Sequence, residues 1–188
     1  MFVLGVDPGL SRCGYAVLES MGRGKARAVA MGVIRTAPAD PVPARLAELQ
    51  GELRGLLEEF GPVVVAVERI FFQNNVRTAV GVAQASGLAM AESARRGIEV
   101  VEYSPTAVKS VVAGDGRAEK VQVQTMVQML LGLAQPPKPA DAADAAALAL
   151  CHLAHDPTLG RRPRPAPSGP TGARPTGARP TSARPVAP

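Results

Sequence analysis

Two aspartates stand three residues apart in the alanine-rich stretch PADAADAAALALCHLA, residues 139–154. On a helix, Asp141 and Asp144 share one face. Two further acids each end an apolar run: Asp7 ends FVLGVD and Glu68 ends VVVAVE. Four carboxylates in one place repel each other, and hard divalent cations with oxygen ligands relieve that repulsion. If the fold brings the four acids together, the set suits Mg²⁺ or Mn²⁺, and two such ions can flank a scissile phosphate.

Each acid also has a purely structural interpretation. Asp141 is a suitable helix N-cap, and Asp144 suits the positive end of the helix dipole. Asp7 precedes a proline and can begin a turn. Glu68 can be a surface acid at a strand end that pairs with Arg69. Periodicity does not decide between these alternatives, because only the fold brings the four residues together.

The elements that must position these acids indicate an α/β domain. Residues 2–7, 15–20 and 26–36 are strand candidates joined by turns, with PGLSRCG (8–14) as turn chemistry. Helical leucine spacing then runs to Phe60, and Gly61-Pro62 stops that helix. The following elements alternate: strand 63–68, helix 76–96, strand 98–104, a helix from Pro105, and helices 118–133 and 141–155. The pattern predicts an antiparallel meander plus parallel strands in one mixed sheet covered by helices.

Composition divides the chain into a folded body, residues 1–156, and a disordered tail, residues 157–188. The tail is rich in proline and arginine and repeats PTGAR, PTGAR, PTSAR over residues 170–184. Its six arginines account for more than the whole formal charge of +5, so the basic pI says little about the body. The tail is read mainly as solvated chain, with weak electrostatic contact to nucleic acid as the alternative.

Cysteine usage and hydropathy indicate a cytoplasmic protein. Cys13 and Cys151 have neither metal-ligand spacing nor a disulfide framework, which fits a reducing compartment. The N-terminus lacks a basic region, and no apolar run reaches the length that crosses a membrane. We therefore expect no signal peptide and no membrane association.

Four blocks, in order, resemble one protein family. They are GVDPGLSRCGYAV (5–17), VAVERIFFQNNVRTAVGVAQASG (65–87), YSPTAVKSVVAGDGRAEKVQVQTMV (103–127) and PADAADAAALALCH (139–152). Together they are similar to the bacterial RuvC family of Holliday-junction resolvases, within the ribonuclease H superfamily, over residues 1–155. The resemblance implies a ribonuclease H-like fold and a homodimeric, Mg²⁺-dependent endonuclease that makes paired nicks in four-way DNA junctions. It also implies two metal ions per subunit with Mn²⁺ as a substitute, and the RuvA–RuvB branch-migration complex as a partner.

The resemblance assigns roles to eight residues. The catalytic, metal-binding carboxylates fall on Asp7, Glu68, Asp141 and Asp144. Lys109 and Lys120 fall on basic positions near the DNA or the reacting phosphate, although each also suits a solvated helix face. Phe71 falls on an aromatic position that disturbs base stacking at the junction, whereas Phe72 suits packing. Asn75 is a candidate DNA contact. Ser86 departs from the arginine of several relatives, which removes a basic side chain there.

The small, apolar helix 76–96 has two interpretations: it is either intramolecular core or, as the resemblance implies, part of a dimer interface. Two other functions compete with junction cleavage. One is an ATPase of the actin and sugar-kinase class, which also opens with an Asp-x-Gly hairpin, but the body is too short for two lobes. The other is a junction-binding protein without catalysis, which would have no use for four intact acids.

Overall fold

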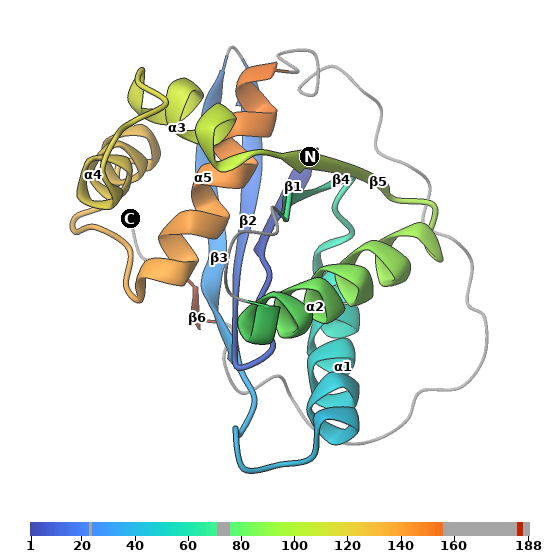
Figure 1. Ribbon diagram of the computed structural model, residues 1–188. Helices are drawn as coiled ribbons and strands as arrows, with labels where there is room; N and C mark the ends of the chain where they lie inside the picture. Colours follow the sequence, from blue (N-terminus) through green and yellow to red (C-terminus); the bar gives the residue numbers. More distant parts are fainter. Residues whose placement is uncertain (23, 71–75, 156–183, 186–188) are drawn as a thin grey trace.

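The computed structural model describes residues 1–22, 24–70, 76–155 and 184–185, which form one sheet with helices on both faces (Figure 1). In chain order the elements are β1 (Phe2–Asp7), β2 (Arg12–Gly22), β3 (Lys25–Arg35), α1 (Val42–Phe60), β4 (Val64–Glu68), α2 (Val76–Ala94), β5 (Glu99–Tyr103), α3 (Pro105–Ala113), α4 (Lys120–Leu131), α5 (Ala140–His155) and β6 (Arg184–Pro185).

The sheet is mixed, with strand order β5-β4-β1-β2-β3-β6. Strands β1, β2 and β3 form an antiparallel meander, while β4 lies parallel to β1 and β5 lies parallel to β4. The two residues of β6 pair with Ala30 and Met31 at the β3 edge. The predicted combination of a meander and parallel strands is confirmed.

One face of the sheet is covered by α1 and α2. The apolar stripe of α1 buries Leu49, Leu53, Leu56 and Leu57 against the strands, as the helical leucine spacing predicts. The helix ends at Gly61, whose left-handed backbone (φ 53°) lets its N–H donate to the Leu57 carbonyl.

A buried acid joins α1 to α2. Glu92 of α2 is only 1% exposed, and its carboxylate accepts hydrogen bonds from Gln50 (2.6 Å) and Arg54 (3.1 Å) of α1. Arg96, just after α2, also donates to it at 2.7 Å. These hydrogen bonds, that of Arg54 first, lower the pKa of Glu92 to about 2 although burial opposes ionisation.

The opposite face of the sheet is covered by α5, with α3 and α4 packed beside it (Figure 1). Eleven of the sixteen residues of α5 are buried, and most of these are alanines. Small side chains let the helix lie directly on β1 and β2. The functional consequence is that the acids near the start of α5 come close to the strand ends.

The structure corrects one local prediction. Residues 8–14 were expected to be turn, but β2 begins at Arg12, and Gly14 pairs with Asp7 across the β1–β2 ladder. The run of turn-forming residue types misleads here because Gly14 serves close packing inside a strand. The division into body and tail stays a prediction, since residues 156–183 lie outside the described part. Within that part, no helix combines the length and apolar character that a membrane crossing requires.

Candidate active site

Asp7 and Glu68 lie side by side at one edge of the sheet. Strands β1 and β4 are parallel neighbours in the register Val6↔Val67, so each strand ends on its acid. The alternation of side chains turns both acids toward α5, on the face where Val3, Val64 and Ala66 form the core. The two acids are therefore neighbours at the carboxyl ends of adjacent parallel strands.

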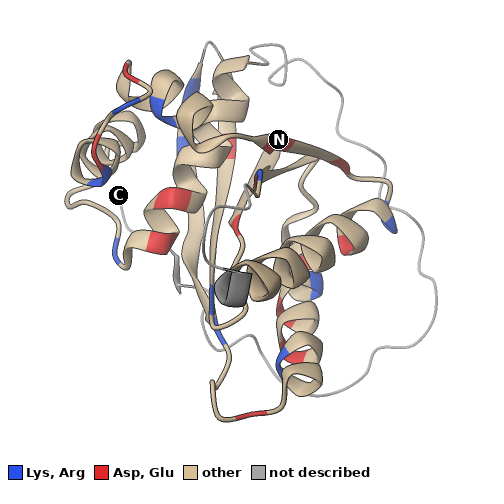
Figure 2. Cartoon of the chain, in the orientation of Figure 1, with Lys and Arg blue, Asp and Glu red and all other residues tan. Residues whose placement is uncertain are grey.

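Helix α5 reaches this edge because two strand positions lack a side chain. A methyl group added at Gly5 would overlap the carbonyl of Ala145, and one at Gly14 would overlap the carbonyl of Asp141. Both glycines point toward α5, and their absence of Cβ allows helix and sheet backbones to touch. Figure 2 shows both acids of α5 near the beginning of that helix. The sequence analysis did not identify these glycines, although a glycine within a strand indicates close backbone approach.

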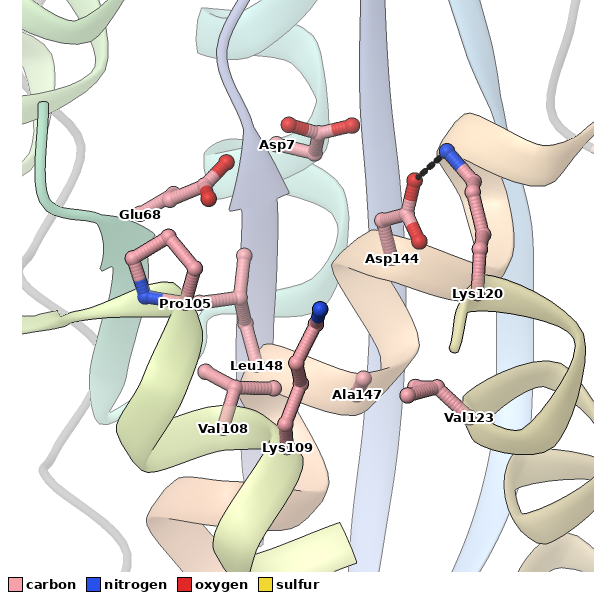
Figure 3. Close-up of a pocket in the computed structure, with 10 residues that line it drawn as sticks. All are labelled: Asp7, Glu68, Pro105, Val108, Lys109, Lys120, Val123, Asp144, Ala147 and Leu148. Carbon is pink, nitrogen blue, oxygen red and sulfur yellow. Dashed lines mark hydrogen bonds and ion pairs between the residues drawn. The ribbon is translucent and has the colours of Figure 1, made fainter. Parts of the chain in front are cut away.

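Three of the four predicted carboxylates line one pocket of about 370 Å³. Figure 3 shows Asp7, Glu68 and Asp144 around this space, with the amine of Lys109 pointing toward them from α3. The remaining lining residues are Lys120 and the apolar Pro105, Val108, Val123, Ala147 and Leu148. The pocket therefore joins an acidic wall, two basic side chains and an apolar floor.

The negative charges of the pocket disfavour one another. Burial, followed by the charges of Glu68 and Asp144, raises the pKa of Asp7 to about 8. Burial also raises the pKa of Glu68, and the charge of Asp144 adds to the rise. The pKa values of Asp7 and Glu68 are both raised, so the pair resists carrying two negative charges at once. A positive charge beside these carboxyl groups would stabilise their ionised forms.

Lys120, the first residue of α4, supplies part of that charge. Its Nζ lies 2.5 Å from Asp144 Oδ2 (Figure 3). This hydrogen bond raises the pKa of Lys120, so the ammonium form persists at neutral pH. The helix begins there because Glu119 and Gln122 form a capping box. Lys109 lies on the preceding helix, α3, which begins after the N-cap Ser104.

Asp141 lies close to the pocket but not in its lining. Its Oδ2 accepts hydrogen bonds from Arg12, from Nε at 3.1 Å and from Nη2. Burial alone would raise the pKa of Asp141, but the Arg12 guanidinium outweighs it and lowers the pKa. Sequence reasoning missed Arg12, because the residue was assigned to a turn rather than to the first position of β2.

The donor set fits a hard divalent cation. The pocket presents only carboxylate oxygens as anionic ligands, and those carboxylates repel one another in the absence of a cation. No three Asp, Glu, His or Cys side chains in the described ranges are already assembled as a metal cage. Two of the four acids are ion-paired instead, Asp141 with Arg12 and Asp144 with Lys120.

Three predicted positions have a different outcome. Phe71 and Asn75 lie outside the described residues. Ser86 is described and is buried in α2, with 2% of its surface exposed. A side chain at that depth does not present itself to DNA from the surface of this subunit.

Comparison with known proteins agrees with this geometry. A family model described as crossover junction endodeoxyribonuclease RuvC matches residues 3–152. The RuvC protein of Salinispora arenicola is 50% identical over 161 residues, which cover 86% of this chain and 92% of that protein. The RuvC protein of Frankia casuarinae is 48% identical over 171 residues, covering 91% and 99% of the two chains.

A solved structure gives the same result in three dimensions. The structure described as Thermus thermophilus RuvC in complex with Holliday junction substrate superimposes with a TM-score of 0.79 at 35% identity. The match covers 84% of this chain and 96% of that chain. The family match takes in nearly all of β1 to β5, the helices α1 to α4, most of α5 and the four acids. The chain belongs to the RuvC family of crossover junction endodeoxyribonucleases.

Proposed function

We propose that this protein is a structure-selective endonuclease that resolves four-way (Holliday) DNA junctions by paired, symmetric nicks, in homologous recombination and DNA repair. One observation carries the proposal. Asp7, Glu68 and Asp144 converge on a single pocket with Lys109 and Lys120, in a chain whose body matches the RuvC family from residue 3 to residue 152. The T. thermophilus relative was solved with such a junction as its substrate.

Asp7, Glu68, Asp141 and Asp144 would hold two Mg²⁺ ions per subunit, with Mn²⁺ as a substitute, because all four offer hard oxygen ligands. Such ions activate an attacking water and stabilise the leaving oxygen when they are bound. The protein contributes the fixed placement of the ligands: two at adjacent strand ends and two on a helix that lies against the same sheet edge.

The reaction is hydrolysis of a phosphodiester. Water attacks phosphorus in line, the bond to the 3′ oxygen breaks, and the products carry a 5′-phosphate and a 3′-hydroxyl group. Lys109 and Lys120 line the pocket, where their ammonium groups lower the energy of the extra negative charge on phosphorus. Family resemblance adds Phe71 as a stacking residue at the junction centre and Asn75 as a DNA contact.

The proposed active unit is a homodimer, since two identical sites suit the approximate twofold symmetry of a junction. Helix α2 supports this, because it leaves Val80 52% exposed and carries the exposed, small Gly87. The RuvA–RuvB branch-migration complex is the proposed partner by family. A reducing, cytoplasmic location is proposed from the two buried free cysteines, Cys13 and Cys151.

The test is a nicking assay with the full-length protein on a synthetic mobile junction and on linear duplex, with Mg²⁺ or with EDTA. We expect paired cuts on the junction only, and only with Mg²⁺. Asp7→Asn should lose cleavage and keep junction binding, because it removes a metal ligand from the pocket without adding bulk. The matched control Asp40→Asn changes an exposed acid before α1 and should cut like the wild type.

Three results would contradict the proposal. Near-normal cleavage by Asp7→Asn would remove Asp7 from the catalytic set. Junction binding by the wild-type protein without any cleavage in Mg²⁺ or Mn²⁺ would favour the binding-only alternative. ATP turnover that depends on Asp7 would revive the kinase-like hypothesis.

A further inference from the structure

The four carboxylates are not equivalent in this structure. Asp7, Glu68 and Asp144 line the pocket, whereas Asp141 does not. Asp141 Oδ2 instead accepts two donors from one guanidinium, the Nε and Nη2 of Arg12. The fourth acid is thus already neutralised, and by a residue to which the proposed reaction gives no role.

The ladder places Arg12 in position for this ion pair. Arg12 is directly opposite Arg35 in the β2–β3 register, so two like charges stand on adjacent strands and on one face of the sheet. Gly14, two residues further along β2, lies on the same face and contacts the backbone of Asp141. The charge of Arg35 therefore repels the Arg12 guanidinium, and the carboxylate of Asp141 is the anion that this guanidinium contacts.

The other ion pair of the site differs in kind. Lys120 lines the pocket while it contacts Asp144, so this pair leaves a positive charge at the pocket wall. Arg12 is not a lining residue, and neither is the acid that it contacts, Asp141. The guanidinium is also charged at every physiological pH, so changes of pH do not release it.

We propose that Arg12 is a positioning residue that competes with the divalent cation for Asp141 and holds this carboxylate out of the pocket until the cation binds. The inference rests on the proposed function, because it takes the four acids as the metal ligands. Its consequence is a measurable one: the wild-type protein binds divalent cations more weakly than its carboxylates alone would allow.

The test measures Mn²⁺ binding to the full-length, DNA-free protein by titration calorimetry and by the electron paramagnetic resonance of unbound Mn²⁺. Arg12→Gln should bind Mn²⁺ about 1.5-fold to five-fold more tightly, the range for loss of an exposed ion pair. Arg12→Lys, which keeps the charge, should stay nearer the wild type. The matched control is Arg27→Gln, which breaks the comparable β2–β3 pair of Arg27 with Glu19 and should leave Mn²⁺ affinity unchanged.

A double-mutant cycle with Asp141→Asn separates this effect from a general change in charge. When residue 141 carries no carboxylate, Arg12→Gln should give no gain in Mn²⁺ affinity. If Arg12→Gln does not fold, Arg12→Met, which keeps the aliphatic stem over the sheet, serves for the same measurements.

Two outcomes would overturn the inference alone: wild-type affinity in Arg12→Gln, or a gain that persists beside Asp141→Asn. A wild-type protein that binds no Mn²⁺ would overturn both this inference and the metal site of the proposed function. A wild type that binds Mn²⁺ but cuts no junction would contradict the proposed function and leave the competition between Arg12 and the cation measurable.

Discussion

At the scale of single residues, the candidate site is a balance of charges that the backbone imposes. Burial and neighbouring charges raise the pKa of Asp7, Lys120 pairs with Asp144, and Arg12 pairs with Asp141. The strands and α5 hold these acids close together, although their negative charges repel one another. The protein pays for that placement with stability when no cation is bound.

The raised pKa of Asp7 predicts a pH-dependent stability. The folded state holds the Asp7 proton up to about pH 8, whereas the unfolded chain releases it near 3.8. The free energy of unfolding in EDTA should therefore fall as pH rises from 3.8 through about 8. Asp7→Asn should remove this loss of stability. The variant should be on the order of 1–3 kcal/mol more stable than the wild type above pH 8, and the two proteins should be equally stable near pH 4.

Urea unfolding of both proteins in EDTA, at about pH 5 and about pH 8.5, measures the difference. Saturating Mg²⁺ should shrink it, since a bound cation stabilises the ionised wild-type site. If the free energy of unfolding has the same pH dependence in the wild type and in Asp7→Asn, the fold does not hold the Asp7 carboxyl in its protonated form.

At the scale of elements, the decisive contact is that of α5 with β1 and β2. The sequence predicted a helix near residues 141–155 and strands that end on Asp7 and Glu68, and all three are confirmed. Periodicity gave no indication of which helix touches which strand. Gly5 and Gly14 decide that question, because their missing side chains let the backbone of α5 reach the sheet.

Gly14→Ala should therefore move the start of α5 away from Asp7. A displacement of about 1 Å at a catalytic group costs roughly 100-fold in rate, so junction cleavage should fall by at least that factor. The control is Gly51→Ala on the exposed face of α1, where a methyl group meets no atom within 4 Å. The control should cut normally and gain about 0.5–1 kcal/mol of stability, because alanine favours a helix over glycine.

Cleavage rates and urea unfolding curves of the two glycine variants give both readouts. Wild-type cleavage by Gly14→Ala would show that α5 accommodates the methyl group without moving its acids. Destabilisation by Gly51→Ala would contradict the open space beside that position.

The contact between α1 and α2 depends on Glu92. Its lowered pKa means that its stabilising effect is complete above pH 4.5, the ordinary value, and is lost as pH falls through about 2. Glu92→Gln should lower the free energy of unfolding at pH 7 by roughly 1–3 kcal/mol and match the wild type at the acid end. Glu58 is a partner of Arg96 whose side chain is 63% exposed, so Glu58→Gln should change the free energy of unfolding by about 0.5 kcal/mol or less.

Urea unfolding across this pH range measures both variants. An equal loss in Glu58→Gln and Glu92→Gln would mean that burial of Glu92 adds nothing to the strength of the network.

At the scale of the whole molecule, the body and the tail carry different properties. The acids, the pocket and the family match all lie within residues 1–156. The arginine repeats lie beyond them and add the positive charge. We predict that residues 1–156 cut a mobile junction with Mg²⁺ as the full chain does, and that the full chain binds more tightly only at low salt.

Labelled-strand mapping of both cuts, for the truncated and the full-length proteins, tests this division. Paired symmetric cuts by both would show that the tail is dispensable for cleavage. Cleavage by the full chain alone, with both proteins bound to the junction, would make the arginine tail part of the active enzyme.

The sequence by itself determined the types of the elements, their order, and the two acids at strand ends, because hydrophobic period and turn chemistry are local properties. It also carried four motif blocks specific enough to imply the family. Only the tertiary structure decided that Asp141 stands apart from the pocket, that Arg12 holds it, and that Gly14 belongs to a strand. The place of Asp141 depends on its contact with Arg12, 129 positions away, and that of Gly14 on pairing with β1 and β3. No local pattern encodes such contacts between separate elements.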